Sequence, residues 1–155
     1  MKERLVSRVT ADFFLRYADL MAQRFDGSFQ RGIIFLAVVQ ANVAHLSHLS
    51  EESLRYAELD SPPPDTVRRP APINAIASSL SLPYETVRRH IHALIEDGHC
   101  VKVRGKGVIV PARVLESEEN TLALRRSYEY LRNMMGILRR AGVDMGETDS
   151  VRETV

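Results

Sequence analysis

The order of patterns between residues 73 and 110 limits the folds open to this chain more than any other feature. Residues 73–80 carry apolar side chains on one face of a short helix, and Ser-Leu-Pro at 81–83 then makes a turn. From 84 to 98 apolar side chains recur at helical spacing until Asp-Gly, where glycine suits the left-handed residue that ends a helix. Residues 99–110 read as two short strands joined by Arg-Gly-Lys-Gly. We therefore expect a mainly α chain with helix, tight turn, helix and two-stranded hairpin in that order.

Further helices are expected before this segment. Thr10 can cap a first helix that stops at Asp26-Gly27. A second helix, residues 29–49, is apolar on most sides, so it needs cover on more than one face. In a chain of 155 residues we expect a second subunit to give that cover. A short helix over residues 50–59 completes this part of the chain.

A long last helix is expected after the hairpin. Ser117 or a neighbour caps it, and Gly142 ends it. Its apolar residues step by four and three in a heptad-like stripe, which predicts packing against a partner helix. The stripe consists of Leu124, Tyr128, Leu131, Met135 and Leu138.

Positive charge is concentrated in the middle of the chain. The net charge is only +1, but residues 66–113 hold 8 basic and 3 acidic side chains, a net of +5. Residues 1–65 hold 7 basic and 9 acidic side chains, and residues 114–155 hold 6 and 8, so each flank has a net charge of −2. A basic segment between mildly acidic ones indicates an anionic partner for that segment.

Helix, tight turn, helix and basic hairpin is the order of a winged helix-turn-helix, in which the second helix enters the major groove of DNA. Because Val87, Ile91 and Leu94 take the inner face of that helix, the residues between them are exposed. Arginine there can bind guanine O6 and N7, and basic hairpin residues can contact phosphates. The candidate DNA-binding residues are Tyr84, Thr86, Arg88, Arg89 and His92 on the helix and Lys102, Arg104, Gly105 and Lys106 on the hairpin.

Each candidate also has a structural interpretation. Arg88 and Arg89 could simply form a solvated helix face, and Tyr84 could pack at the edge of the core. Thr86 could only support the first turn of the helix. Glu85 could accept from a cytosine, but an acid beside DNA is also repulsive, so it is not counted among the candidates.

The segment from about residue 70 to 111 resembles the DNA-binding domain of the GntR family of bacterial transcription regulators. The residues that carry the resemblance are Ile76-Ala77, Thr86-Val87-Arg88, Leu94, Asp97-Gly98 and Gly105-Lys106-Gly107. Pro83-Tyr84 stands where that family usually has Ser-Arg, which puts the usual contacts there in doubt. With helices on both sides, the whole chain is more similar to MarR-type regulators, which dimerise through terminal helices, although their acidic-arginine wing signature is absent.

These observations predict five regions. They are an N-terminal helical dimerisation region (1–60), a proline-rich linker (61–69), a winged-helix DNA-binding domain (70–113), a C-terminal helix (114–142) and a flexible tail (143–155). We expect a cytoplasmic homodimer that binds an inverted repeat in double-stranded DNA and regulates transcription. Two alternatives stay open: a winged helix that docks proteins, and a DNA-binding protein of replication or plasmid maintenance.

Other functions find less support in the sequence. No nucleotide-binding, hydrolase or metalloprotease motif is present, so we expect no enzyme and no cofactor. His45 and His48, or the histidines near Cys100, could hold a metal, but chance histidines are the preferred interpretation. The single cysteine and the lack of a signal-type or membrane-spanning run predict a cytoplasmic protein without membrane contact. Residues 33–39 could line a small-molecule effector pocket, as in MarR-type proteins, or form dimer core, and dimer core is preferred.

Overall fold

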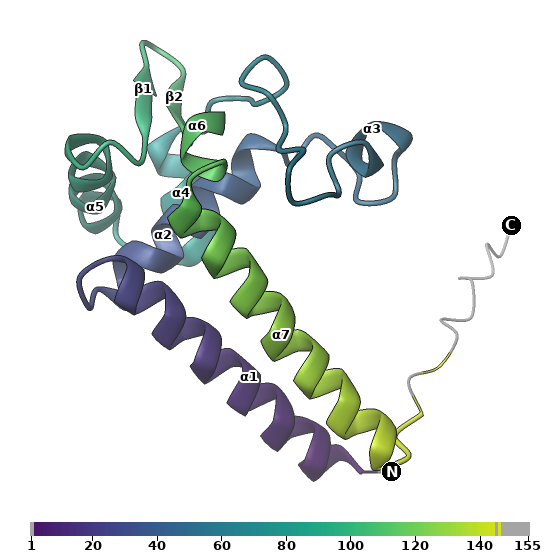
Figure 1. Ribbon diagram of the computed structural model, residues 1–155. Coiled ribbons are helices and arrows are strands. Elements are labelled where there is room, and N and C mark those ends of the chain that lie inside the picture. Colours follow the sequence, from purple (N-terminus) through teal and green to yellow (C-terminus); the bar gives the residue numbers. More distant parts are fainter. Residues whose placement is uncertain (1, 145, 147–155) are drawn as a thin grey trace, which may run out of the picture.

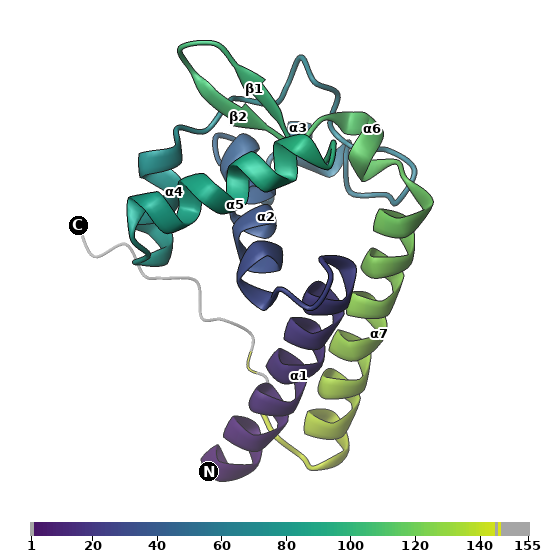
Figure 2. The same cartoon turned by 90° about the vertical axis from the view of Figure 1, so that its left-hand side faces the viewer.

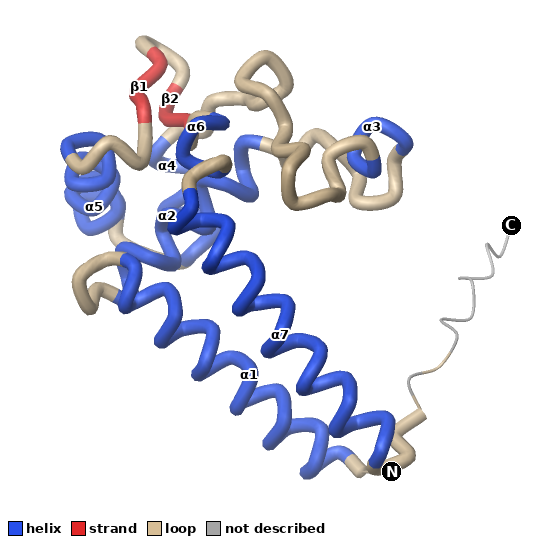
Figure 3. Tube along the Cα trace, in the orientation of Figure 1, coloured by secondary structure: helices blue, strands red, loops and turns tan. Residues whose placement is uncertain are grey.

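The computed structural model describes residues 2–144 and 146, and within those bounds the protein is mainly helical (Figure 1). One antiparallel pair of strands accompanies the helices, as the coloured tube in Figure 3 shows. In chain order the elements are α1 (Glu3–Arg24), α2 (Phe29–Asn42), α3 (Glu51–Leu54), α4 (Ile73–Leu80), α5 (Tyr84–Glu96), β1 (Val101–Val103), β2 (Gly107–Ile109), α6 (Ala112–Leu115) and α7 (Glu118–Arg140). The expected mainly α chain with a two-stranded sheet is confirmed at this level.

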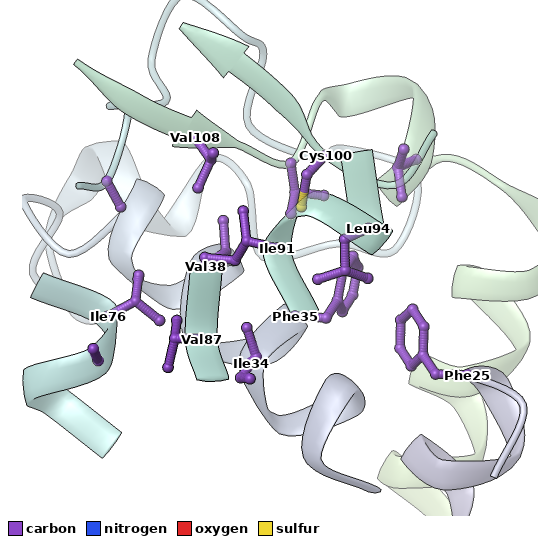
Figure 4. Close-up of a cluster of buried hydrophobic side chains, with 14 residues drawn as sticks. Phe25, Ile34, Phe35, Val38, Ile76, Val87, Ile91, Leu94, Cys100 and Val108 are labelled. Atoms are coloured by element: carbon purple, nitrogen blue, oxygen red, sulfur yellow. The ribbon is translucent and has the colours of Figure 1, made fainter. Parts of the chain in front are cut away.

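The main core is formed by α2, α4, α5 and the β1–β2 hairpin (Figure 4). Its largest fully buried side chains come from all of these elements: Ile34, Phe35 and Val38 of α2, Ile76 of α4, Val87, Ile91 and Leu94 of α5, and Val108 of β2. The cover for Ile34, Phe35 and Val38 comes from α4, α5 and β2 of the same chain, so burial of these residues does not require a second subunit. Burial of this aliphatic and aromatic surface is the main favourable contribution to folding of the core.

The tight connection between α4 and α5 follows from local geometry. Ser81 ends α4 in the left-handed conformation with φ of 53°, and the Leu82 N–H donates to the Ala77 carbonyl at 3.1 Å. Pro83 then directs the chain into α5, which begins at Tyr84. At the other end Gly98 takes φ of 80°, so the chain turns out of α5 towards β1.

A single residue before α4, Ala71, pairs with the hairpin and joins it to the preceding chain. Val101 pairs with Ile109, and Val103 pairs with Gly107. Ala71 lies antiparallel to Val108, and these two residues exchange two main-chain hydrogen bonds of 2.9 Å. The hairpin is therefore held from both sides, by its own turn and by residue 71.

Gly107 makes the contact with Ala71 sterically feasible. Its φ is +122°, and a Cβ at this position would lie 2.1 Å from the Ala71 oxygen. The close approach of Gly107 is thus to the chain's own backbone. Gly105, at φ of +72°, is different, because nothing lies within 4 Å of where its Cβ would stand.

A buried asparagine ends α2 earlier than expected. Asn42 is fully buried and lies at the end of the helix, which the sequence analysis extended to residue 49. Its amide donates to the carbonyls of Arg69 at 2.8 Å and Val108 at 3.0 Å, and its oxygen accepts from the Val110 N–H at 2.9 Å. The Arg69 N–H in turn donates to the Asn42 carbonyl at 2.8 Å. The proline-rich segment expected as a linker is thus tied to the core at its end.

The helices α1 and α7 lie side by side and antiparallel, and they project away from the core as a two-helix arm (Figures 1 and 2). The helix α1 begins at Glu3 and not near Thr10, since nothing in the intervening residues breaks a helix. At the far end of the arm, Lys2 Nζ donates to the Ala141 carbonyl. Of the expected tail, residues 145 and 147–155 lie outside the described residues.

The predicted stripe on α7 does not face α1. Leu138 is 4% exposed, but the other four members are between 41% and 61% exposed: Leu124, Tyr128, Leu131 and Met135. The smaller Ala123 packs instead with Leu20 and Met21 of α1. Four of the five stripe residues are therefore left largely exposed by the described part of this chain.

Candidate nucleic-acid interface

The outer face of α5 carries most of the candidates predicted on this helix. Val87, Ile91 and Leu94 are fully buried against the core, as expected from their spacing. The intervening side chains therefore lie on the opposite face. Tyr84 is 51% exposed and Thr86 is half-buried. Arg89 and His92 are both exposed on the face that points away from the core.

Arg88 is engaged in a local ion pair. Its Nε donates to Glu85 Oε2 at 2.9 Å, and its Nη2 donates to Glu85 Oε1, so the pair is bidentate. The hydrogen bond from Arg88 lowers the pKa of Glu85, and the same bond raises the pKa of Arg88. Arg88 would have to exchange Glu85 for another acceptor, whereas Arg89 has no ion pair among the described residues.

The hairpin supplies the second group of cations. Lys102 lies on β1, and Arg104 and Lys106 lie in the turn; all three are exposed. Gly105 at the tip is also exposed. Lys106 donates its main-chain N–H to the Val103 carbonyl at 3.0 Å, which closes the turn. The hairpin thus holds three cationic side chains on a short, backbone-fixed support.

The structure places α5 and the hairpin on one side of the molecule. In Figure 1 both lie on the left, and Figure 2, which turns that side to the viewer, shows α5 across the front with the hairpin beside it. The arm extends away from both elements. The two elements that bear the predicted residues therefore lie on one side, and the arm does not separate them.

The start of α5 adds to the positive character of this side. Pro83 precedes the helix and no side chain caps it, so the first N–H groups have no side-chain acceptor. A helix N-terminus carries a partial positive charge and can bind an anion such as a phosphate. Glu85, in the first turn, partly offsets this charge, although its carboxylate is bound to Arg88.

His90, His99 and Cys100 contact neighbouring residues of this chain. The His99 ring packs edge-on against Phe25 and Phe35, with ring centres 5.2 and 6.1 Å apart. The His90 Nε2 lies 2.9 Å from Gln30 Oε1. Burial raises the pKa of the Cys100 thiol to about 12. Within the described part of the chain, no three His, Cys, Asp or Glu side chains are grouped closely enough to hold a metal ion.

Two features of this side were missed from the sequence. The Glu85–Arg88 pair could have been found, because residues three apart on a helix are neighbours. The contact of Ala71 with β2 had no local signal, because it joins segments separated by the two intervening helices.

Among the described residues, no helix combines the length and the apolar character that crossing a membrane requires.

Comparison with known proteins does not name a family. Searches of protein-family models, curated proteins and solved structures gave no match to this chain. The resemblance to GntR and MarR regulators therefore stays a prediction based on the residues themselves.

Proposed function

We propose that this protein is a winged-helix transcription regulator that binds duplex DNA as a homodimer. The observation that carries the proposal is that α5 and the β1–β2 hairpin, which both bear exposed cationic residues, lie on the same side of one core. The order of α2, α4, α5 and the hairpin matches what a winged helix requires. Its middle segment holds the excess positive charge of the chain, 8 basic against 3 acidic residues between 66 and 113.

In this proposal α5 enters the major groove. An α-helix with its side chains is about 10–12 Å across, and the major groove is about 12 Å wide, so one helix fits. Arg89 and His92 are exposed and can reach base edges. Arg88 joins them when a guanine or phosphate replaces Glu85 as its acceptor. Thr86 and the uncapped start of α5 are suited to the flanking phosphate.

The hairpin contacts the sugar-phosphate backbone or the minor groove beside that site. Lys102, Arg104 and Lys106 are cations on a short loop, and such contacts fix the orientation of a protein on DNA. Gly105 has open space around it, so the backbone of the tip can approach DNA closely. The result is a two-point attachment, with bases contacted by α5 and phosphates contacted by the hairpin.

The arm provides the dimer contact. Its exposed apolar residues include Phe14 and Leu15 on α1 and Leu131 and Met135 on α7. Exposed apolar residues gathered on one element are typical of an interface, and a two-fold pair is the commonest assembly. Two copies of α5 would then enter successive major grooves about 34 Å apart, on an inverted repeat.

Salt dependence of DNA binding tests the hairpin contacts directly. Removing a single cation–phosphate interaction flattens the slope of log affinity against log salt by about 0.9. We expect the double variant Arg104→Ala/Lys106→Ala to flatten the slope by about 1.8 on a random duplex. The matched control is Arg4→Ala/Arg8→Ala, which removes the same charge from exposed positions on α1.

The outcomes separate the alternatives. Equal slopes for the hairpin variant and the parent protein would remove the hairpin from the interface. No binding of random duplex by the parent protein at low salt would favour a protein-docking function instead. Selection of bound fragments from random DNA then tests for a preferred inverted repeat, and its absence would count against sequence-specific regulation.

A further inference from the structure

A cavity of about 650 Å³ lies where the arm meets the core. It is lined by residues of α1, α2 and α7 and of the chain between residues 56 and 68, and it is open to solvent on one side. This volume is typical of sites for small molecules. Most of the lining is apolar, and four aromatic side chains contribute to it: Tyr17, Phe35, Tyr56 and Tyr128. The site is separate from the outer face of α5 and from the hairpin, neither of which lines it.

Arg24 brings a positive charge into this wall. Its side chain is 5% exposed, and its guanidinium carbon lies 4.6 Å from the centre of the Phe35 ring. Nη1 donates to Asn120 Oδ1 at 2.7 Å, and Nε lies 3.9 Å from Glu119 Oε1. The Nε and Nη2 groups have no hydrogen-bond acceptor among the described residues. Burial lowers the pKa of Arg24, and Glu119 only partly opposes this effect.

Arg68 adds a second buried guanidinium, from the segment that follows α3. The residue is 5% exposed, its Nε donates to the Pro63 carbonyl at 3.3 Å, and its Nη1 has no acceptor among the described residues. Burial lowers the pKa of Arg68, with Asp65 acting in the opposite direction. Asp65 already accepts the Ala112 N–H at 2.7 Å, so its charge is shared. Burying two cationic groups whose N–H donors lack acceptors costs free energy of folding, unless a bound anion supplies those acceptors.

The charges on the lining favour an anion over a cation. Of the described residues that line the cavity, Arg24, Arg68 and Arg125 are basic and Glu58 is acidic. Glu58 is exposed, so water screens its charge more than it screens the two buried arginines. The cavity therefore combines an apolar, aromatic space with a net positive wall.

We infer that this cavity binds an amphipathic carboxylate, whose anionic group is held by Arg24 and Arg68 and whose apolar body lies among the aromatic side chains. The carboxylate supplies the acceptors that the two guanidinium groups lack, and arginine is well suited to such bidentate pairing. The apolar body fills space that otherwise leaves aromatic and aliphatic surface uncovered. A neutral analogue of the same shape gains only the second of these contributions.

The test compares two probes of the same size on the full chain. Binding of sodium 2-naphthoate and of 2-naphthamide is measured by calorimetry and by the shift in melting temperature. We expect saturable binding of naphthoate and at least about tenfold weaker binding of the amide, which corresponds to one charge-assisted hydrogen bond. Arg68→Met keeps much of the side-chain length and should remove this preference. Arg126→Met removes an exposed arginine of α7 that does not line the cavity, so it should keep the preference.

Folding of the variants is controlled separately. If Arg68→Met does not fold, Val39→Phe gives a second test, because Val39 lines the cavity and a larger side chain should block both probes without changing charge. The inference is overturned if naphthoate and naphthamide bind equally well, if neither binds, or if Val39→Phe leaves naphthoate binding unchanged. No DNA is present in these measurements, so their failure is distinct from failure of the proposed function.

Discussion

Replacing Gly107 by alanine should weaken the attachment of the hairpin more than the same change at Gly105. Both glycines have positive φ, +122° and +72°, so alanine is strained at either position. They differ in their surroundings. A Cβ on residue 107 would lie 2.1 Å from the Ala71 oxygen and 2.4 Å from the Ala71 carbonyl carbon, whereas a Cβ on residue 105 meets nothing within 4 Å.

The expected loss in free energy of unfolding depends on which part of the backbone must shift to accommodate the new Cβ. At residue 105 the cost is the backbone strain alone, about 1–2 kcal/mol. At residue 107 the obstacle is main chain and cannot rotate away, so Ala71 must leave Val108. That separation breaks two hydrogen bonds of 2.9 Å, each worth about 1 kcal/mol, in addition to strain of about 1–3 kcal/mol. We therefore expect Gly107→Ala to lower the free energy of unfolding by about 3–5 kcal/mol.

Urea unfolding monitored by circular dichroism measures both variants under the same conditions. The linear extrapolation gives the free energy of unfolding, and an unchanged m-value would show that the comparison is valid. A difference between Gly107→Ala and Gly105→Ala of less than about 1 kcal/mol would refute the steric reasoning.

Further predictions concern buried polar groups and the arm. Asn42→Ala should lower the free energy of unfolding by about 3 kcal/mol in urea, because it leaves the Arg69 carbonyl and the Val110 N–H without a partner and removes one of the two hydrogen bonds to the Val108 carbonyl. Cys100 should resist iodoacetamide at pH 8 in the folded protein and react in urea, because burial raises its thiol pKa to about 12. Burial lowers the pKa of His90, so the unfolded chain takes up a proton before the folded one. Stability should therefore fall as the pH drops below about 6.5, and His90→Gln should reduce that dependence in urea titrations at several pH values. Leu131→Glu should shift a dimer to monomer in sedimentation experiments without loss of helicity, and an unchanged dimer would exclude this face of α7.

The sequence predicted the part of the fold whose signals are local. The bounds of α4 were expected at residues 73–80 and are confirmed, since amphipathic spacing and the turn after Leu80 define them. The inner face of α5, the glycine that ends it and the cap at Ser117 are also confirmed. Each of these features depends on residues within one or two turns of each other, where spacing and propensity are informative.

Features that depend on distant segments were not predicted. The end of α2 is fixed by the hydrogen bonds of Asn42 to residues 69, 108 and 110, none of which is near it in sequence. The surroundings of Arg24 have the same origin, because its guanidinium contacts Asn120 and Glu119 of α7, about 95 residues further along the chain. Arginine in a sequence usually indicates an exposed side chain, so composition alone points away from such a site.

The outward position of the apolar stripe on α7 shows why helical spacing alone cannot identify a partner. Spacing identifies which side chains share a face, but not which neighbour covers that face. In this arm α7 packs on Leu20 and Met21 of α1 through the small, buried Ala123, which allows the two helices to approach closely. The larger Tyr128 and Leu131 are left 61% and 41% exposed on the same helix. A helix that packs on its own chain on one side and presents large apolar side chains on another is better suited to a second copy than to solvent, which supports the dimeric arm proposed above.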